Sequence, residues 1–187
     1  MADWDICYNW MMDNEDMGRA YKPVSDPVPV RDDDPPEVRQ AKLQAKAISG
    51  INSFYFPSQY MEIFNTAQPD RGPLIQNFYE TAFWNNWFSR MESNEATKRV
   101  FDYAVNGGSG KSVRTLQEAI RSTGNTSIEA DGKWGPLTLA AANSSDEALL
   151  VSAFQAQRLG NYQDTPAIAH LVGTAENPGP LWKRAMK

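Results

Sequence analysis

Hydrophobic residues recur every three or four positions along most of the chain, and this spacing predicts helices. The first helix is expected over residues 3–16, where Trp4, Cys7, Tyr8 and Met11 would share one face. Further helices are expected at residues 37–47, 57–66, 73–88, 94–106, from Ser109 past Ile120, at 136–142, and from Ser144 as cap to about Tyr162, with a last turn around Trp182. Strand signals are weak, so the pattern predicts an all-α fold with at most a small β-hairpin in the N-terminal loop region.

Local signals mark several of the expected helix ends. Ser93 and Ser109 are suited to N-cap positions, Pro136 to the first turn of a helix, and Ser144 with Glu147 has the spacing of a capping box. Residues 22–36 contain five prolines and three consecutive aspartates, which predicts a loop. With no repeat of 20–50 residues and a length of 187, we expect one domain or one domain with a small appendage.

Composition and charge exclude several classes of protein. The net charge is −5 and no basic stripe is present, which argues against a nucleic-acid partner. Cys7 and His170 are the only cysteine and histidine, so an internal disulfide and zinc sites built from several Cys or His are excluded, and we expect no Ser-His-Asp or Cys-His catalysis. Any catalysis would rest on carboxylates, hydroxyls or amides, and we expect neither a metal nor another cofactor.

The sequence also bears on location. The first residues lack a basic region and a long apolar run, and no stretch approaches the roughly 20 apolar residues that span a bilayer. We therefore expect synthesis in the cytoplasm without a signal peptide, and no insertion into a membrane.

Glu15 is the sharpest single candidate for chemistry. It closes a helix face that otherwise carries Trp, Cys, Tyr and Met side chains, and burial there would favour its protonated form. A carboxylic acid that can donate a proton is what cleavage of a glycosidic bond requires. The alternative is a solvated acidic helix end, because Asp13 and Asp16 flank it.

A second carboxylate would be expected if Glu15 acts on a glycosidic bond. Asp26, 11 residues further on in the proline-rich loop, is the first choice. The competing acids nearby are Asp32, Asp33, Asp34 and Glu37. The triple aspartate run also fits a solvated acidic loop or a weak cation site.

Two further features have simpler explanations. Gly107 to Ser112 suggests a phosphate-binding loop, but Val105 occupies the position of its first glycine and a helix precedes it. We therefore expect the glycines to end one helix and begin another. The aromatic residues between 78 and 88 could line a sugar site, although core packing explains their helical spacing as well.

Several short motifs follow one another in a particular order. They are Asn14-Glu15-Asp16, Gly50-Ile51-Asn52, FYETAFW from Phe78, VFDYAVNGG from Val100, LQEAI from Leu116 and ADGKWGPLTLAAAN from Ala130. From about Asp5 to Tyr162 this order resembles glycoside hydrolase family 108, the N-acetylmuramidases of phages and prophages. The last motif looks like the peptidoglycan-binding segment that usually closes such enzymes.

The resemblance implies a lysozyme-like helical fold. Residues 1–107 would form the catalytic region, and residues 108–187 a helical peptidoglycan-binding region packed on it. Glu15 would be the general acid and Asp26 the second catalytic carboxylate. The residues expected to contact substrate are Asn52, Asp102, Tyr103 and Asn106. The implied partner is bacterial peptidoglycan, reached in the periplasm through a holin or from a phage particle.

The chain departs from the family pattern around the expected site. Gly18 and Tyr21 only approximate the family's Glu-Gly-Gly-Tyr, Asp26-Pro27 is all that remains of an Asp-Pro-Gly-Gly-x-Thr loop, and Ala47 replaces a threonine. Two hypotheses follow. The protein is an active muramidase of the endolysin or virion-associated type, or a non-catalytic peptidoglycan-binding or virion structural protein on the same scaffold. An unrelated helical adaptor is a third class, which requires that the order of the motifs is coincidental.

Overall fold

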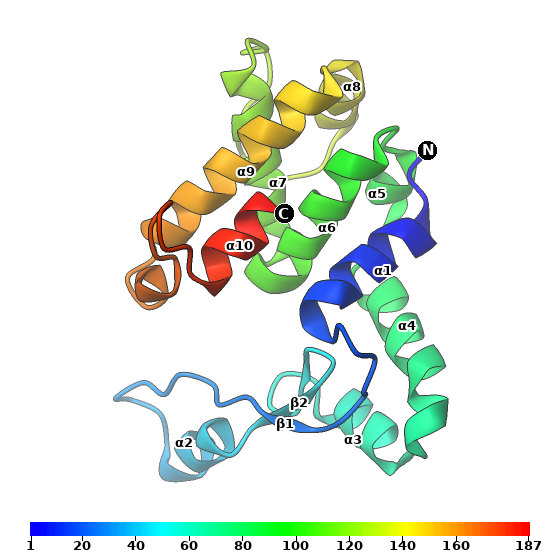
Figure 1. The fold of residues 1–187 in the computed structure, drawn as a ribbon, viewed down its shortest axis with the longest axis vertical. Coiled ribbons are helices and arrows are strands. Elements are labelled where there is room, and N and C mark those ends of the chain that lie inside the picture. Colours follow the sequence, from blue (N-terminus) through cyan, green and yellow to red (C-terminus); the bar gives the residue numbers. More distant parts are fainter. The chain divides into compact units, whose positions relative to one another are not determined.

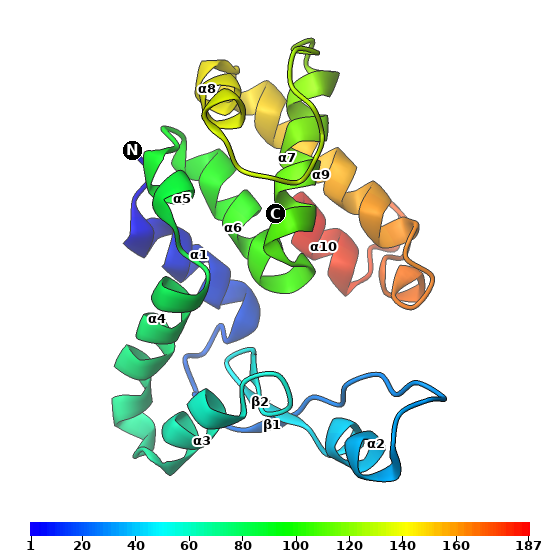
Figure 2. The same ribbon diagram turned by 180° about the vertical axis from the view of Figure 1, so that it is seen from behind.

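The computed structural model describes residues 1–187, and most of them are helical (Figures 1 and 2). Ten α-helices and two short 3-10 helices accompany one small three-stranded sheet, which confirms the predicted mostly-α class with a small β region. The chain divides into two compact units. Residues 8–82 form the N-terminal unit, and residues 1–7 with 83–187 form the C-terminal unit.

The N-terminal unit holds the sheet and the helices around it. Helix α1 (Trp4–Glu15) begins in the C-terminal unit and ends here. The other elements are β1 (Val24–Ser25), α2 (Pro36–Leu43), β2 (Lys46–Ile48), β3 (Ile51–Asn52), α3 (Pro57–Asn65), η1 (Gln68–Asp70) and α4 (Arg71–Ala82). Helices α3 and α4 pack together, with the rings of Phe56 and Phe78 4.9 Å apart and Ile63 and Ile75 buried.

The sheet is antiparallel in the order β1-β2-β3. Ala47 of the central strand pairs with Val24 on one side and Asn52 on the other. Ser49 and Gly50 join β2 to β3 with φ angles of 49° and 82°, and two positive φ angles are typical of a tight hairpin turn. The helix predicted over residues 37–47 is therefore too long, because its last residues form the buried central strand instead.

The C-terminal unit is a group of packed helices (Figure 1). Its elements are α5 (Asn86–Arg90), α6 (Asn94–Gly107), α7 (Ser109–Ser122), α8 (Pro136–Ser144), α9 (Glu147–Gln163), η2 (Ala169–Leu171) and α10 (Pro180–Met186). Helix α9 contacts α6, α7 and α10. The core of this unit includes Val100, Phe101, Leu116, Ile120 and Phe154.

Three predicted helix ends differ in the structure. The helix expected over residues 73–88 is split into α4 and α5, because the Asn85 side chain caps α5 by accepting from the amides of Trp87 and Phe88. Helix α9 is capped by Asp146, which accepts from Leu149 N, and Ser144 instead ends α8. The N-cap of α7 is Gly108 rather than Ser109.

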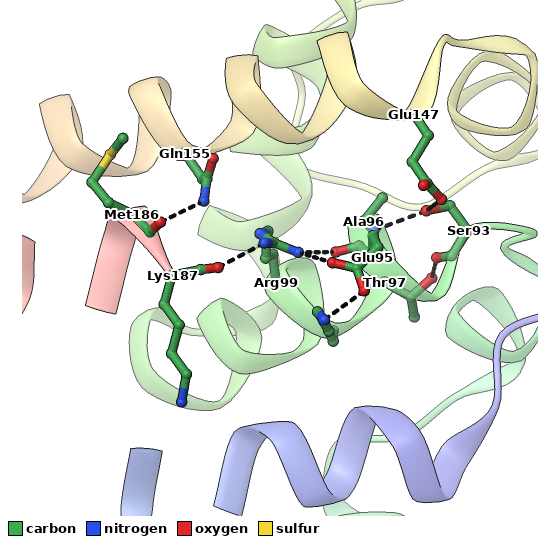
Figure 3. Close-up of polar contacts among 10 residues, drawn as sticks. Ser93, Glu95, Ala96, Thr97, Arg99, Glu147, Gln155, Met186 and Lys187 are labelled. Atoms are coloured by element: carbon green, nitrogen blue, oxygen red, sulfur yellow. Dashed lines mark hydrogen bonds and ion pairs between the residues drawn. The ribbon is translucent and has the colours of Figure 1, made fainter. Parts of the chain in front are cut away.

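The N-cap of α6 is the predicted Ser93, whose hydroxyl accepts from Ala96 N. Figure 3 shows how this end of α6 is tied to other helices. Ser93 also donates to Glu147 of α9, and Arg99 donates to the carbonyl of Lys187, just after α10. Polar contacts thus supplement the apolar packing of α6, α9 and α10.

The first seven residues belong to the C-terminal unit. The Trp4 ring lies 5.3 Å from Trp84 and 5.7 Å from Phe101, and Asp3 N donates to Asn94. The predicted boundary between residues 107 and 108 falls between α6 and α7, which lie in one unit. The division into a catalytic and a binding region is a statement about function and stays a prediction.

Candidate functional site

Glu15 is the last residue of α1, and its carboxylate lies against the β2–β3 hairpin in the N-terminal unit. The residue is half-buried. A Cβ atom built on Gly50 would lie 2.7 Å from Glu15 Oε2, which is closer than real Cβ contacts. Two features therefore favour glycine at this position: its positive φ angle, and the close approach of the Glu15 carboxylate.

Tyr79 of α4 lies beside the same turn. Its hydroxyl donates to the Ser49 carbonyl at 2.7 Å, and the Cβ built on Gly50 would lie 2.6 Å from that hydroxyl. The Tyr79 ring is buried, and the Tyr8 ring lies 6.3 Å away. The Tyr79 phenol group and the Glu15 carboxylate thus both lie close to the open side of this glycine.

The neighbouring Asp16 has a different role. It accepts hydrogen bonds from the Ser49 hydroxyl at 2.8 Å and from the amides of Tyr21 and Ala20 at 2.9 and 3.0 Å. Burial raises the pKa of Asp16, but these hydrogen bonds and Arg19 outweigh it and lower the pKa below its usual value. Asp16 is thus an ionised anchor for the end of α1 and the hairpin.

Asp26 and Asn52, predicted separately as site residues, are brought together by the sheet. The Asn52 side chain donates to Asp26 Oδ2 at 2.7 Å and to the Asp26 carbonyl at 2.9 Å. Asn52 is buried, whereas Asp26 is exposed. Asn52 follows Gly50 by two residues, about 7 Å along a strand. Asn52, which holds Asp26, and Gly50, which the Glu15 carboxylate approaches, are therefore residues of the same hairpin.

The competing acids of the loop are arranged differently from Asp26. Asp34 accepts from Lys42 Nζ at 2.7 Å and from Arg31 N, and these hydrogen bonds hold its pKa below the usual value. Asp32 and Asp33 are exposed. Asp34 thus ties the loop to α2. Asp26 differs from it, because its partner is a side chain of the hairpin, Asn52.

Asp102 lies in the C-terminal unit and is fully buried. Arg158 of α9 donates to its Oδ2 at 2.6 Å, and Arg184 of α10 donates to its Oδ1 at 2.7 Å. Burial raises the pKa of this carboxyl, but the two guanidinium groups outweigh burial and lower it. The side chain joins α6, α9 and α10, and its predicted contact with substrate stays a prediction.

Tyr103 and Asn106 lie on the same helix. Tyr103 is buried under the Arg158 guanidinium, which sits 4.9 Å from its ring centre, and burial raises its pKa to about 12. Asn106 is exposed, and its amide donates back to the Asp102 carbonyl. These three predicted residues lie in a different unit from Glu15, Asp26 and Asn52.

Sequence reasoning missed three residues that surround Glu15, namely Ser49, Gly50 as a contact of the carboxylate, and Tyr79. A signal existed for Tyr79, because a tyrosine within an otherwise apolar aromatic block needs a partner for its hydroxyl when it is buried. Ser49 and Gly50 gave no such signal. Their role depends on a hairpin that the weak strand pattern did not define.

A second candidate region is built around Gln117 of α7. This buried amide donates to Asp131, to the Lys133 carbonyl and to Thr138, and it accepts from Gly132 N. One side chain thereby fixes the whole turn of the ADGKWGPLT motif. Beside the turn lies a hollow of about 510 Å³, here called the Trp134 hollow.

The Trp134 ring is held in place from outside the motif. It stacks on Trp87 with a centroid distance of 6.2 Å and contacts the Phe88 ring edge to face at 5.6 Å. The hollow is thus lined by a motif with a fixed conformation, which is typical of a preformed site for a small ligand.

The comparisons with known proteins address this second region. Residues 111–170 match a family model described as Predicted Peptidoglycan domain. No curated protein and no solved structure matches the chain. The match covers most of α7 and all of α8 and α9 together with the Trp134 hollow, and it links the protein to peptidoglycan.

The structure also bears on membranes and metal ions. No helix is both long and apolar enough to cross a membrane. No group of three or more His, Cys, Asp or Glu side chains is arranged so that it could hold a metal ion.

Proposed function

We propose that this protein is a peptidoglycan hydrolase, an N-acetylmuramidase that cleaves the β-1,4 bond between N-acetylmuramic acid and N-acetylglucosamine. The observation that carries the proposal is the half-buried Glu15 carboxylate against the hairpin turn, in a chain whose residues 111–170 match a peptidoglycan domain. The resemblance of the ordered motifs to glycoside hydrolase family 108 supports the same function.

In this mechanism Glu15 is the general acid that protonates the leaving glycosidic oxygen. Asp26 either stabilises the oxocarbenium-like transition state or activates the attacking water, and the Asn52 amide fixes its orientation. Gly50 leaves room for the Glu15 carboxylate beside the turn, and Tyr79 holds the turn itself through its hydrogen bond to the Ser49 carbonyl. Ala47 is buried in the central strand and offers no hydroxyl to position the attacking water.

We further propose that the protein acts on the cell wall as a phage endolysin or virion-associated lysin. Residues 111–170 would bind the wall while the N-terminal unit cleaves it. No cofactor takes part in the proposed step, since two carboxylates suffice for it.

The test is mass spectrometry of the fragments released from purified peptidoglycan by the wild type and by Glu15→Gln. We expect fragments with reducing-end N-acetylmuramic acid from the wild type, and a loss of at least a hundredfold in their rate of release by Glu15→Gln, because general acid catalysis contributes about 10²–10⁴. Asp13→Asn is the matched control, since this acid lies on the same helix but is exposed and paired with Arg19.

Two results would contradict the proposal. Full activity of Glu15→Gln would remove Glu15 from the reaction. Binding of the wild type to sacculi without any released fragment, even at high protein concentration, would instead establish the non-catalytic peptidoglycan-binding role.

A further inference from the structure

The Trp134 hollow carries charged side chains of both signs at its wall. Glu129 and Lys133 line it together with Asp131, and both Glu129 and Lys133 are exposed. Neither Glu129 nor Lys133 forms an ion pair within the protein. By contrast, Asp131 already accepts from Gln117 and from the Lys133 amide. Two opposite charges are thus available to a ligand at one hollow.

The apolar part of the wall consists of Ile128, Trp134, Pro136 and Leu137, while Gln117, Ser127 and Thr138 add neutral polar groups. Trp134 is clamped by Trp87, while Pro136 begins α8. The indole Nε1 of Trp134 is buried without a hydrogen-bond partner in the protein. A hollow of about 510 Å³ that combines an apolar part with several polar and charged groups has the size of a small-ligand site.

We infer that this hollow binds the peptide part of peptidoglycan rather than its sugars, and the inference rests on the proposed function. The stem peptide carries carboxylates and, at its diamino acid, a free ammonium group, whereas the neutral N-acetylglucosamine chain carries neither. Lys133 would take a carboxylate and Glu129 the ammonium, while the apolar wall covers the aliphatic part of the peptide. The charges of the hollow thereby select the peptide.

The experiment measures binding to the full-length protein by isothermal titration calorimetry. The two probes are the tripeptide L-Ala-γ-D-Glu-diaminopimelate and chitotetraose, a neutral N-acetylglucosamine chain. We expect the tripeptide to bind, and Lys133→Met and Glu129→Gln each to weaken it about tenfold, as loss of one charged hydrogen bond implies. Higher salt should weaken it as well, because the charges are exposed.

Lys111→Met is the matched control. It removes an equal charge within residues 111–170, but Lys111 lines a different hollow of about 400 Å³. Its affinity for the tripeptide should equal that of the wild type. Circular dichroism of each variant confirms that it is folded.

Co-sedimentation with intact sacculi separates this inference from the proposed function. In one outcome the wild type binds sacculi, and Lys133→Met and Glu129→Gln bind the tripeptide as tightly as the wild type does. This outcome overturns the inference but not the proposed function. Binding of chitotetraose but not of the tripeptide would also overturn the inference alone. If the wild type does not bind sacculi at all, the proposed function and the inference both fail.

Discussion

At the scale of single residues, Gly50 decides the position of the candidate acid. Its φ of 82° is a conformation that L side chains rarely adopt, and its Cα lies close to both the Glu15 carboxylate and the Tyr79 hydroxyl. The sequence contained the Gly-Ile pair, but the contact with Glu15 emerges only when α1, α4 and the hairpin are assembled.

Gly50→Ala should displace the Glu15 carboxylate and lower muramidase activity at least tenfold, because small misplacements of a catalytic group are costly. The positive φ should also reduce the free energy of unfolding by about 1 kcal/mol. Both quantities are measured on the purified variant, by release of reducing ends and by urea denaturation.

Gly18→Ala is the control for this change. No atom lies within 4 Å of a Cβ built there, and the residue follows Glu15 by only three positions. Its activity and stability should match the wild type. Unchanged activity and stability of Gly50→Ala would show that the close approach to Glu15 has no consequence.

At the scale of elements, buried charge joins the helices of the C-terminal unit. Asp102 on α6 is shared by Arg158 on α9 and Arg184 on α10, with Arg158 also covering the Tyr103 ring. Such a group adds little by itself to stability compared with apolar packing, but removing one member leaves uncompensated buried charge.

Asp102→Asn should therefore lower the free energy of unfolding at neutral pH by about 3–5 kcal/mol. Because the folded-state pKa of Asp102 is lowered, its contribution is complete above the unfolded pKa of about 4 and is lost as the pH falls further. The wild type should thus lose more stability between neutral pH and pH ~3 than Asp102→Asn does. Urea denaturation at both pH values measures this.

Glu95→Gln is the control on the same helix. The Glu95 side chain is 46% exposed and pairs with Lys98 and with Arg99 (Figure 3). Because this carboxylate is exposed, its loss should cost about 1 kcal/mol or less. Equal costs for the two variants would contradict a special role for the buried group.

At the scale of the whole molecule, the first seven residues complete a unit that otherwise consists of residues 83–187. Trp4 supplies the link, because its ring packs against Trp84 and Phe101. This unit is therefore built from two segments that are separated in the sequence. A fragment beginning after residue 82 would lack the Trp4 part of the aromatic core.

Trp4→Ala should destabilise the C-terminal unit by about 2–4 kcal/mol, since it removes a large ring from an aromatic cluster. Hydrogen exchange should show faster exchange of amides in α6, more than 85 residues away along the chain. Ile6→Ala is the control, because that side chain is 47% exposed and its loss should cost well under ~1 kcal/mol. Unchanged protection of α6 in Trp4→Ala would show that residues 1–7 do not stabilise this unit.

The sequence by itself determined the local features of the protein. Helical spacing placed α1, α3, α6 and α8 within one or two residues, Ser93 and Pro136 were correctly placed at helix starts, and the mostly-α class followed. These features depend on residues three or four positions apart, and such spacings can be read directly from the sequence.

Only the tertiary structure decided the partners of the candidate residues. Asp26 meets Asn52 across 26 residues, and Asp102 meets arginines 56 and 82 residues away. Such pairs depend on which faces of distant elements pack together, and no local period encodes that choice. For the same reason the sequence identified Glu15 as an acid on an apolar helix face, but its close approach to Gly50 required the folded chain.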